Sequence, residues 1–134
     1  MSDQLLKLNL TGTNISQKTG ELIIQNIPFG LETLDLTKNP LICSDPERKT
    51  MKLLCNEILN NENPTVRYSL LYLILDYCNL GNKGVEHLCH ALEDNRKLKF
   101  LDISNNKINQ FGAFHIGRML LNNQCLSVLF LHYN

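Results

Sequence analysis

The residues of this chain that could do chemistry are a few cysteines and histidines in its second half. Cys55 and Cys89 fall within two expected helical segments, and His87 and His90 lie close to the second cysteine. A metal site built from them would need C-x-x-C spacing, or ligands that share one face of a helix. No cysteine pair has that spacing, and His90 adjoins Cys89 instead of sharing its face. Since free cysteines are among the most buried residue types, the sequence predicts buried thiols, no metal site and no catalytic residue.

Phosphate and hydrolase chemistry lack support as well. The segment Gly81-Asn82-Lys83-Gly84 combines glycine with lysine, but the G-x-x-x-x-G-K-[ST] pattern of a nucleotide-binding loop is missing around it. A turn into a helix explains both glycines. No Ser-His-Asp order, H-E-x-x-H motif or paired-carboxylate context stands out. The sequence therefore predicts a protein that is not an enzyme and binds no cofactor.

Charge and composition limit the classes of partner and the cellular location that the sequence allows. Thirteen basic and thirteen acidic residues give a formal net charge of zero, which argues against binding to nucleic acid or to an anionic membrane. No apolar run reaches the roughly 18 residues of a membrane span. The first residues do not form a secretory signal, and the five cysteines are odd in number and dispersed. We therefore expect reduced thiols and a cytoplasmic location.

A repeat of 28 residues sets the elements that position all of these groups. Three copies of the repeat begin at Leu70, Leu98 and Leu126. Their first halves read LLYLILDYCNL, LKFLDISNNKI and LSVLFLHYN. Each segment fits L-x-x-L-x-L-x-x-N/C, the signature of a leucine-rich repeat. Alternation in the first half of each unit indicates a strand, and apolar residues on one face of the second half indicate a helix.

The pattern extends toward the N-terminus in two looser units. Their matching positions are Leu31, Leu34, Leu36, Asn39 and Leu41 in one unit, and Leu5, Leu8, Leu10, Thr13 and Ile15 in the other. The longer of the two predicts a helix from about Pro46 to Asn60, with Pro46 in the first turn after a cap at Ser44 or Asp45. Its extra residues fall before this helix and in the connection from Pro64 to Ser69, where length is tolerated.

The units resemble the ribonuclease-inhibitor type of leucine-rich repeat. The period, the glycine four residues after the last strand-half Leu or Ile, and the stretch NLGNKGVEHLCHALEDNRKL carry this resemblance. It implies an α/β solenoid of about 4.5 repeats, a short right-handed arc with a parallel sheet on its concave face and helices on its convex face. The family includes inhibitors, actin-capping proteins, receptor-type sensors, ciliary proteins, Ran GTPase activators and bacterial effectors, so the fold does not select a function.

We expect one domain over residues 1–134. Its units are placed at approximately 5–30, 31–69, 70–97, 98–125 and 126–134, and the last of them is incomplete. Stopping there leaves a strand edge and an apolar helix face without a neighbour. Three explanations stay open: a fragment of a longer protein, a truncated gene product, or an end that docks on another copy or on a partner.

One set of residues is expected to serve the scaffold alone. Side chains at the turn after each strand can bond backbone groups that the turn leaves unpaired, and each such group would cost about 1 to 3 kcal/mol if it stayed buried without a partner. The residues at this position in four of the units are Asn39, Cys78, Asn106 and Asn134. We interpret them as a structural turn ladder.

The outward-facing strand positions change character along the array. They are small and polar in the first two units, and aromatic or apolar in the last three. A contiguous exposed apolar patch marks an interaction site, and aromatic residues ringed by polar ones are typical of a protein interface. The predicted partner-binding residues are Tyr72, Ile74, Asp76, Tyr77, Phe100, Asp102, Asn105, Val128, Phe130, His132 and Tyr133. Cover by a continuation of the chain, or by a second copy, is the alternative for this patch.

These observations favour a non-catalytic module that binds another protein through its concave sheet face. An enzyme regulator, such as a GTPase activator or an enzyme inhibitor, is the first alternative. It would need an exposed arginine or a set of acidic residues placed to enter an active site, and the candidate arginines, Arg67, Arg96 and Arg118, are all expected on loops or convex helices. A structural subunit of a ciliary or cytoskeletal assembly and a bacterial effector are the others. Self-association through the C-terminal edge is compatible with the zero net charge.

Overall fold

Each unit opens with a strand of three residues whose central leucine faces the core. The strands are β1 (Lys7–Asn9), β2 (Thr33–Asp35), β3 (Tyr72–Ile74), β4 (Phe100–Asp102) and β5 (Val128–Phe130). They form one parallel sheet in chain order, from β1 to β5. Parallel neighbours cannot be joined by a hairpin and need a crossover connection, which the second half of each unit supplies. The computed structural model describes residues 4–60 and 68–134.

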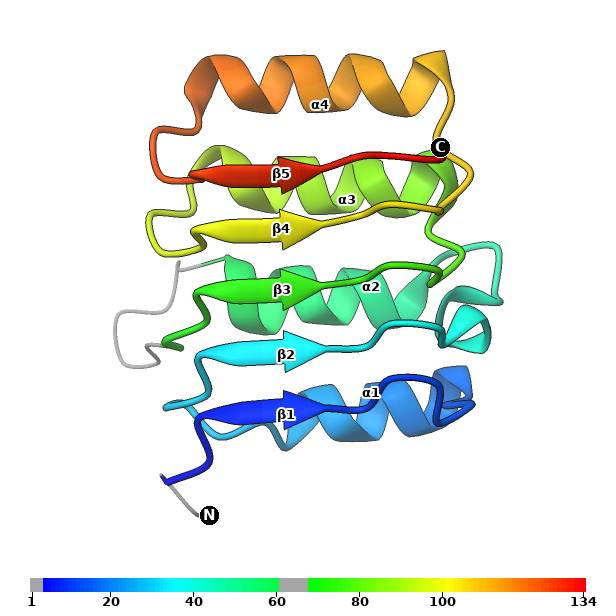
Figure 1. The fold of residues 1–134 in the computed structure, drawn as a ribbon, viewed down its shortest axis with the longest axis vertical. Helices are drawn as coiled ribbons and strands as arrows, with labels where there is room; N and C mark the ends of the chain where they lie inside the picture. Colours follow the sequence, from blue (N-terminus) through cyan, green and yellow to red (C-terminus); the bar gives the residue numbers. More distant parts are fainter. Residues whose placement is uncertain (1–3, 61–67) are drawn as a thin grey trace.

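The crossovers are helices, and all of them cover the same face of the sheet (Figure 1). They are α1 (Gln17–Gln25), α2 (Lys49–Leu54), α3 (Gly81–Glu93) and α4 (Gln110–Asn122), with a 3-10 helix, η1 (Pro40–Cys43), before α2 and a π-helical turn, η2 (Cys55–Leu59), after it. Ser16 and Asn109 cap α1 and α4, because their side-chain oxygens accept hydrogen bonds from the Thr19 and Phe111 amides. The expected α/β solenoid is confirmed.

The helix of the second unit begins later than the sequence indicated. The prediction that Pro46 lies in its first turn was wrong, since α2 starts at Lys49. Arg48 just before it has a left-handed backbone (φ 53°), which breaks the helical path. Its guanidinium fixes that bend by donating to the carbonyl of Asp45 at 2.6 Å and of Leu80 at 3.0 Å. Most of the expected insertion from Pro64 to Ser69 lies outside the described residues.

The core lies between the sheet and the helices. Leu34, Leu73 and Leu101, the central residues of β2, β3 and β4, are almost completely buried. They belong to one hydrophobic cluster with buried residues of the helices. Gly112 permits the close approach of α4 to α3, because a Cβ there would lie 2.7 Å from Asn82 Oδ1 and 2.6 Å from Ile108 Cγ2. No helix among the described residues is long and apolar enough to cross a membrane.

Candidate partner-binding face

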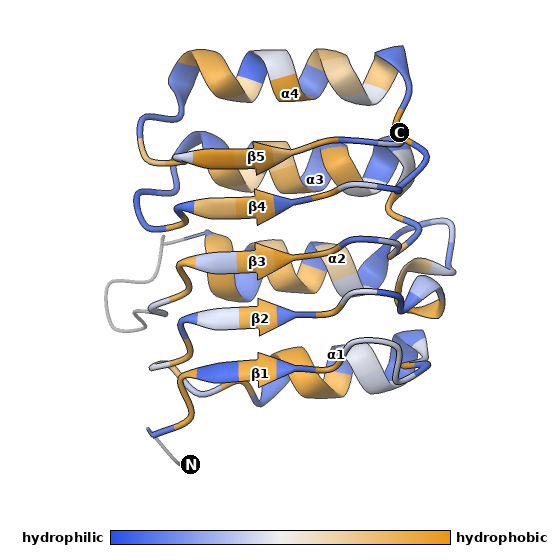
Figure 2. Cartoon of the chain, viewed as in Figure 1, coloured by the Kyte–Doolittle hydropathy of each residue, from blue (hydrophilic) through white to orange (hydrophobic). Residues whose placement is uncertain are grey.

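The register of the sheet arranges the outward-facing residues in two rows. One row runs Lys7, Thr33, Tyr72, Phe100 and Val128, and the other runs Asn9, Asp35, Ile74, Asp102 and Phe130. Neighbours within a row are about 4.8 Å apart along the hydrogen-bonding direction. The strands become more apolar from β1 and β2 toward β5 (Figure 2). Both rows therefore begin polar and end apolar.

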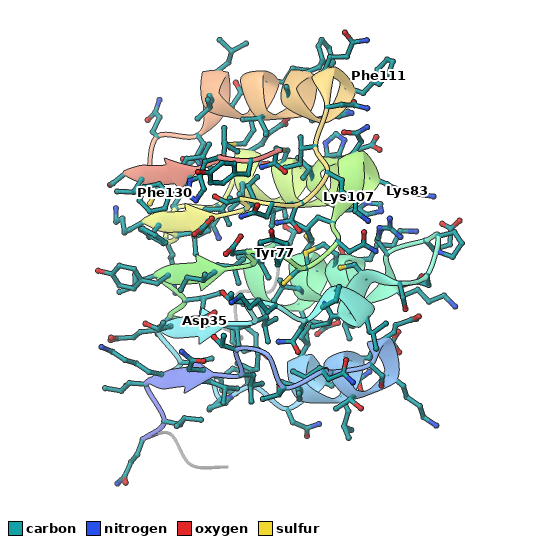
Figure 3. The ribbon with its side chains drawn as sticks, turned by 45° about the vertical axis from the view of Figure 1, so that its right-hand side comes forward. Asp35, Tyr77, Lys83, Lys107, Phe111 and Phe130 are labelled. Atoms are coloured by element: carbon teal, nitrogen blue, oxygen red, sulfur yellow. The ribbon has the colours of Figure 1, made fainter. Side chains whose placement is uncertain are left out.

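An aromatic run crosses the last three strands. The ring centroids are 6.1 Å apart for Tyr72 and Phe100, and 5.3 Å apart for Phe100 and Phe130, which meet edge to face. The run continues from Phe130 to His132 at 5.8 Å and from His132 to Tyr133 at 5.5 Å. Tyr72 and Phe130 remain 45% and 43% exposed. Figure 3 shows Phe130 on the sheet side of the molecule, far from Phe111 on α4.

The polar residues of the predicted set are held by bonds within the molecule. Asp102 Oδ1 accepts from the Ser104 amide at 2.9 Å, and Asp76 Oδ1 accepts from Asn105 Nδ2 at 2.8 Å. Both carboxylates are thus fixed beside the aromatic run. Ser104, which donates one of these bonds through its amide, is fully buried.

A hollow of about 620 Å³ adjoins the aromatic run at the turns that follow the strands. Tyr77, Asn105 and Tyr133 line it together with Leu41 and Lys107; Figure 3 shows Tyr77 and Lys107 at this end of the sheet. Both tyrosines have a left-handed backbone (φ 56°). All five units have a left-handed residue at this position, so the turn requires the conformation, and the type of side chain is free to vary. The structure thus gathers Tyr77, Asn105 and Tyr133 at one edge of the row of rings.

The turn residues after the strands form a ladder of hydrogen bonds. Asn106 accepts from the amides of Cys78 and Leu80 at 3.0 and 3.1 Å, and it donates to the carbonyls of Leu75 and Ser104 at 2.7 and 2.8 Å. Asn39 and Asn134 bond equivalent groups in their own and the preceding unit. The thiol of Cys78 donates to the Leu36 carbonyl at 3.1 Å. Most of these bonds join consecutive units, so the ladder helps to fix the register on which the two outward rows depend.

Comparison with known proteins agrees with this architecture. A family model described as "Leucine Rich repeat" matches residues 69–89 and 94–114. Ribonuclease inhibitor from Sus scrofa is 34% identical over 95 residues, which cover 71% of this chain and 19% of the relative. The chain is a leucine-rich-repeat protein of the ribonuclease-inhibitor-like type. FERM domain-containing protein C from Dictyostelium discoideum is 29% identical over 133 residues, which cover 89% of this chain and 8% of the relative. The chain thus spans less than a fifth of the length of either relative.

The leucine-rich-repeat scaffold contains a second asparagine ladder that the sequence analysis missed. Asn95 and Asn123 lie between a helix and the next strand. Asn95 accepts from the Lys97 and Leu98 amides and donates to the Leu59 carbonyl at 3.0 Å. Asn123 makes the equivalent bonds one unit later. Their separation of one full period was the available signal.

The cysteines of this leucine-rich-repeat protein are placed for packing. Burial raises the pKa of Cys43, Cys55 and Cys89 to about 12, and it raises the pKa of Cys78 as well. A thiol reacts and ligates metals as the thiolate, and these four are protonated at neutral pH. Cys125 is also buried, with its sulfur 3.2 Å from Lys99 Nζ.

Arg96 and Arg118, the two described arginines among the candidates for an enzyme regulator, lie away from the concave face. Arg96 follows α3 and donates to the Glu93 carbonyl at the end of that helix. Arg118 lies exposed on α4, in the convex layer. Arg67 lies outside the described residues.

Proposed function

We propose that this protein is a non-catalytic interaction module that binds another protein through the aromatic part of its concave face. The observation that carries the proposal is the continuous run of rings from Tyr72 to Tyr133 on a surface that the scaffold does not need to be apolar. Polar residues occupy the same positions in the first two strands, so the fold itself tolerates them. Leucine-rich-repeat domains generally bind proteins, which agrees with this role.

The layout favours a partner that inserts an apolar or aromatic segment along the last three strands. Binding energy concentrates in buried aromatic anchors with a polar rim. Phe100 and Phe130 supply the centre, while Asp76 and Asp102 stand beside them with carboxylates already fixed by internal bonds. The hollow lined by Tyr77 and Tyr133 offers a place for one side chain of the partner.

The test compares two surfaces of one folded protein. A triple variant, Tyr72→Ser, Phe100→Ser and Phe130→Ser, should lose a partner that native cross-linking with mass spectrometry locates on the concave face. A matched control, Phe111→Ser with Phe114→Ser, removes two exposed rings from α4 on the convex side and should bind normally. Unchanged binding by the triple variant, with a native circular dichroism spectrum, would reject the assignment.

A single substitution at Ile74 distinguishes an apolar contact with the partner from an effect on the stability of the scaffold. Ile74 lies at the position that Asn9, Asp35 and Asp102 occupy in the first, second and fourth strands. Each of those three side chains accepts a hydrogen bond from the backbone amide two residues later. Ile74→Asn supplies the same acceptor without adding a third carboxylate between Asp35 and Asp102. We expect stability to change by less than about 0.5 kcal/mol and the affinity for the partner to fall about tenfold. An unchanged affinity would place the interface elsewhere.

The second candidate is enzyme inhibition, which the similarity to ribonuclease inhibitor favours. An inhibitor would have to cover the enzyme's active site with this same concave face, because the described arginines Arg96 and Arg118 lie elsewhere. Assays of ribonuclease turnover with and without the protein test this role directly. Inhibition that the triple variant abolishes would identify the enzyme as the partner.

The third candidate is self-association through the end formed by α4 and β5. Leu120 and Leu131 are exposed there, and a hollow of about 330 Å³ lies between Ile108, Ala113, Ile116 and Leu131. Light scattering at increasing concentration tests this role. A protein that stays monomeric and still binds its partner does not act through self-association.

We also propose a reducing, cytoplasmic location, which the five buried free cysteines support.

A further inference from the structure

Three side chains with metal-ligating atoms meet on the convex face, on the opposite side of the molecule from the aromatic run. Glu86 and His90 come from α3, and His115 comes from α4. Their ligand atoms all lie within 4.8 Å of one another, with Glu86 Oε1 and His115 Nε2 4.0 Å apart. The imidazole rings of His90 and His115 have centroids 6.1 Å apart. Such convergence needs two neighbouring helices in a fixed register.

The fold supplies that register from residues already described. Glu86 and His90 are four positions apart and so share one face of α3. His115 occupies in α4 the position that His87 occupies in α3, one 28-residue period earlier, and it therefore lies beside this face. Asn82 joins the beginnings of the two helices, because its Oδ1 accepts from the Asn109 and Gly112 amides at 3.0 and 3.1 Å. Side chains on helices held in this way are positioned more precisely than side chains on loops.

We propose that Glu86, His90 and His115 bind one divalent transition-metal ion, with zinc as the best fit. Two imidazoles and one carboxylate are a known zinc ligand set that leaves a fourth position for water. Bonds of about 2.0 to 2.2 Å with tetrahedral angles separate ligand atoms by roughly 3.4 Å, so small side-chain rotations close the observed distances. Magnesium and calcium prefer oxygen ligands and find only the Glu86 carboxylate here.

The surroundings suit an exchangeable ion. Glu86 and His115 are partly exposed and His90 is exposed, so an ion and its water can enter from solvent. The bound ion would clip α3 to α4 and tie the third unit to the fourth. His87, by contrast, has a buried Nε2 that finds no hydrogen-bond partner within residues 4–60 and 68–134. It lines a separate hollow of about 170 Å³ with Cys55 and Lys52. Burial lowers its pKa, and we assign it no ligand role.

The spacing of His87, His90 and the cysteines in the sequence predicted no metal site. His115 was missed because it lies almost a full repeat after Glu86 and His90 in the sequence. The available signal was the E-x-x-x-H spacing of Glu86 and His90 combined with a histidine one period after His87. This inference is independent of the proposed concave interface, and each can fail alone.

The experiment uses untagged protein that has been stripped with a chelator and dialysed. Isothermal titration with zinc chloride should show one ion per chain, and the melting temperature should rise with zinc but not with magnesium. Cobalt(II) should give the visible absorption of a tetrahedral site. Glu86→Gln, His90→Ala and His115→Ala should each weaken zinc binding by about tenfold or more, since even outer-shell changes cost that much.

The matched control is His132→Ala, which removes a histidine from the concave face and should leave zinc affinity unchanged. Equal zinc affinity in His115→Ala and the unaltered protein would overturn the proposal. Zinc-driven dimers that persist in His115→Ala would overturn it as well, because the ion would then bridge two chains. Loss of binding in the ligand variants counts only when circular dichroism shows native helix content, and Glu86→Gln preserves the shape of the residue for this purpose.

Discussion

The first two strands and the last three share one scaffold and present different surfaces. Leu34 in β2 and Leu101 in β4 are equally buried, and Asn39 and Asn106 make the same kinds of bonds after them. Outward, however, Thr33 and Asp35 face solvent in β2, whereas Phe100 and Phe130 meet edge to face across β4 and β5. The difference teaches that the inward half of each strand specifies the solenoid and that the outward half is free to vary.

The largest expected effect tests whether the two regions are equal inside. Leu34→Ala and Leu101→Ala should each destabilise the protein by about 2 to 5 kcal/mol, because both remove a fully packed core side chain. Urea unfolding followed by circular dichroism measures this change. If only one of the two substitutions lowered stability, the two regions would not share an equivalent core, and the comparison would fail.

The turn ladder gives the next largest effect. Asn39→Ala and Asn106→Ala should each cost about 2 to 3 kcal/mol, because several buried backbone groups lose their partners together. The exposed Asn122 on α4 is the control, and Asn122→Ala should change stability by less than about 0.5 kcal/mol. Equal effects of the buried and exposed substitutions would remove the structural role assigned to the ladder.

The outward rows should differ in coupling energy. A double-mutant cycle of Phe100→Ala and Phe130→Ala should give a favourable coupling of about 0.5 to 1.5 kcal/mol, as is typical of an edge-to-face pair. The equivalent cycle in the polar region uses Asn9 and Asp35, whose side chains are 3.2 Å apart and exposed. That pair should couple by about 0.2 to 0.5 kcal/mol. A reversed order would show that the rings do not pack as a unit.

The smallest effect is a pH dependence confined to the C-terminal region, where all four histidines lie. Burial lowers the pKa of His87 below its ordinary value of 6.5, so the unfolded chain binds more protons than the folded chain just below that pH. Stability should therefore fall as the pH drops through about 6.5. His87→Gln should flatten this decline in chemical denaturation, and hydrogen exchange should show the loss in α3 before α1. An identical decline in the variant would contradict the assignment.

Much of the scaffold could be predicted because its signals are local and periodic. Leu73, Leu101 and Leu129 recur every 28 residues, and parallel register follows from equal spacing, so the sequence indicates which strand residues lie side by side. The start of α2 was missed because the bend at Arg48 depends on a bond to Leu80 in the next unit, which no local pattern encodes.

The sequence by itself determined the leucine-rich-repeat architecture, since a fixed period of apolar and asparagine positions permits one way of stacking the units. It also determined which residues lie side by side in the sheet. Only the tertiary structure decided that Asp76 and Asp102 are fixed by internal bonds, that two tyrosines border a hollow, and that Glu86 and His90 meet His115. These arrangements depend on side-chain direction and helix packing between units, and a repeat pattern specifies neither.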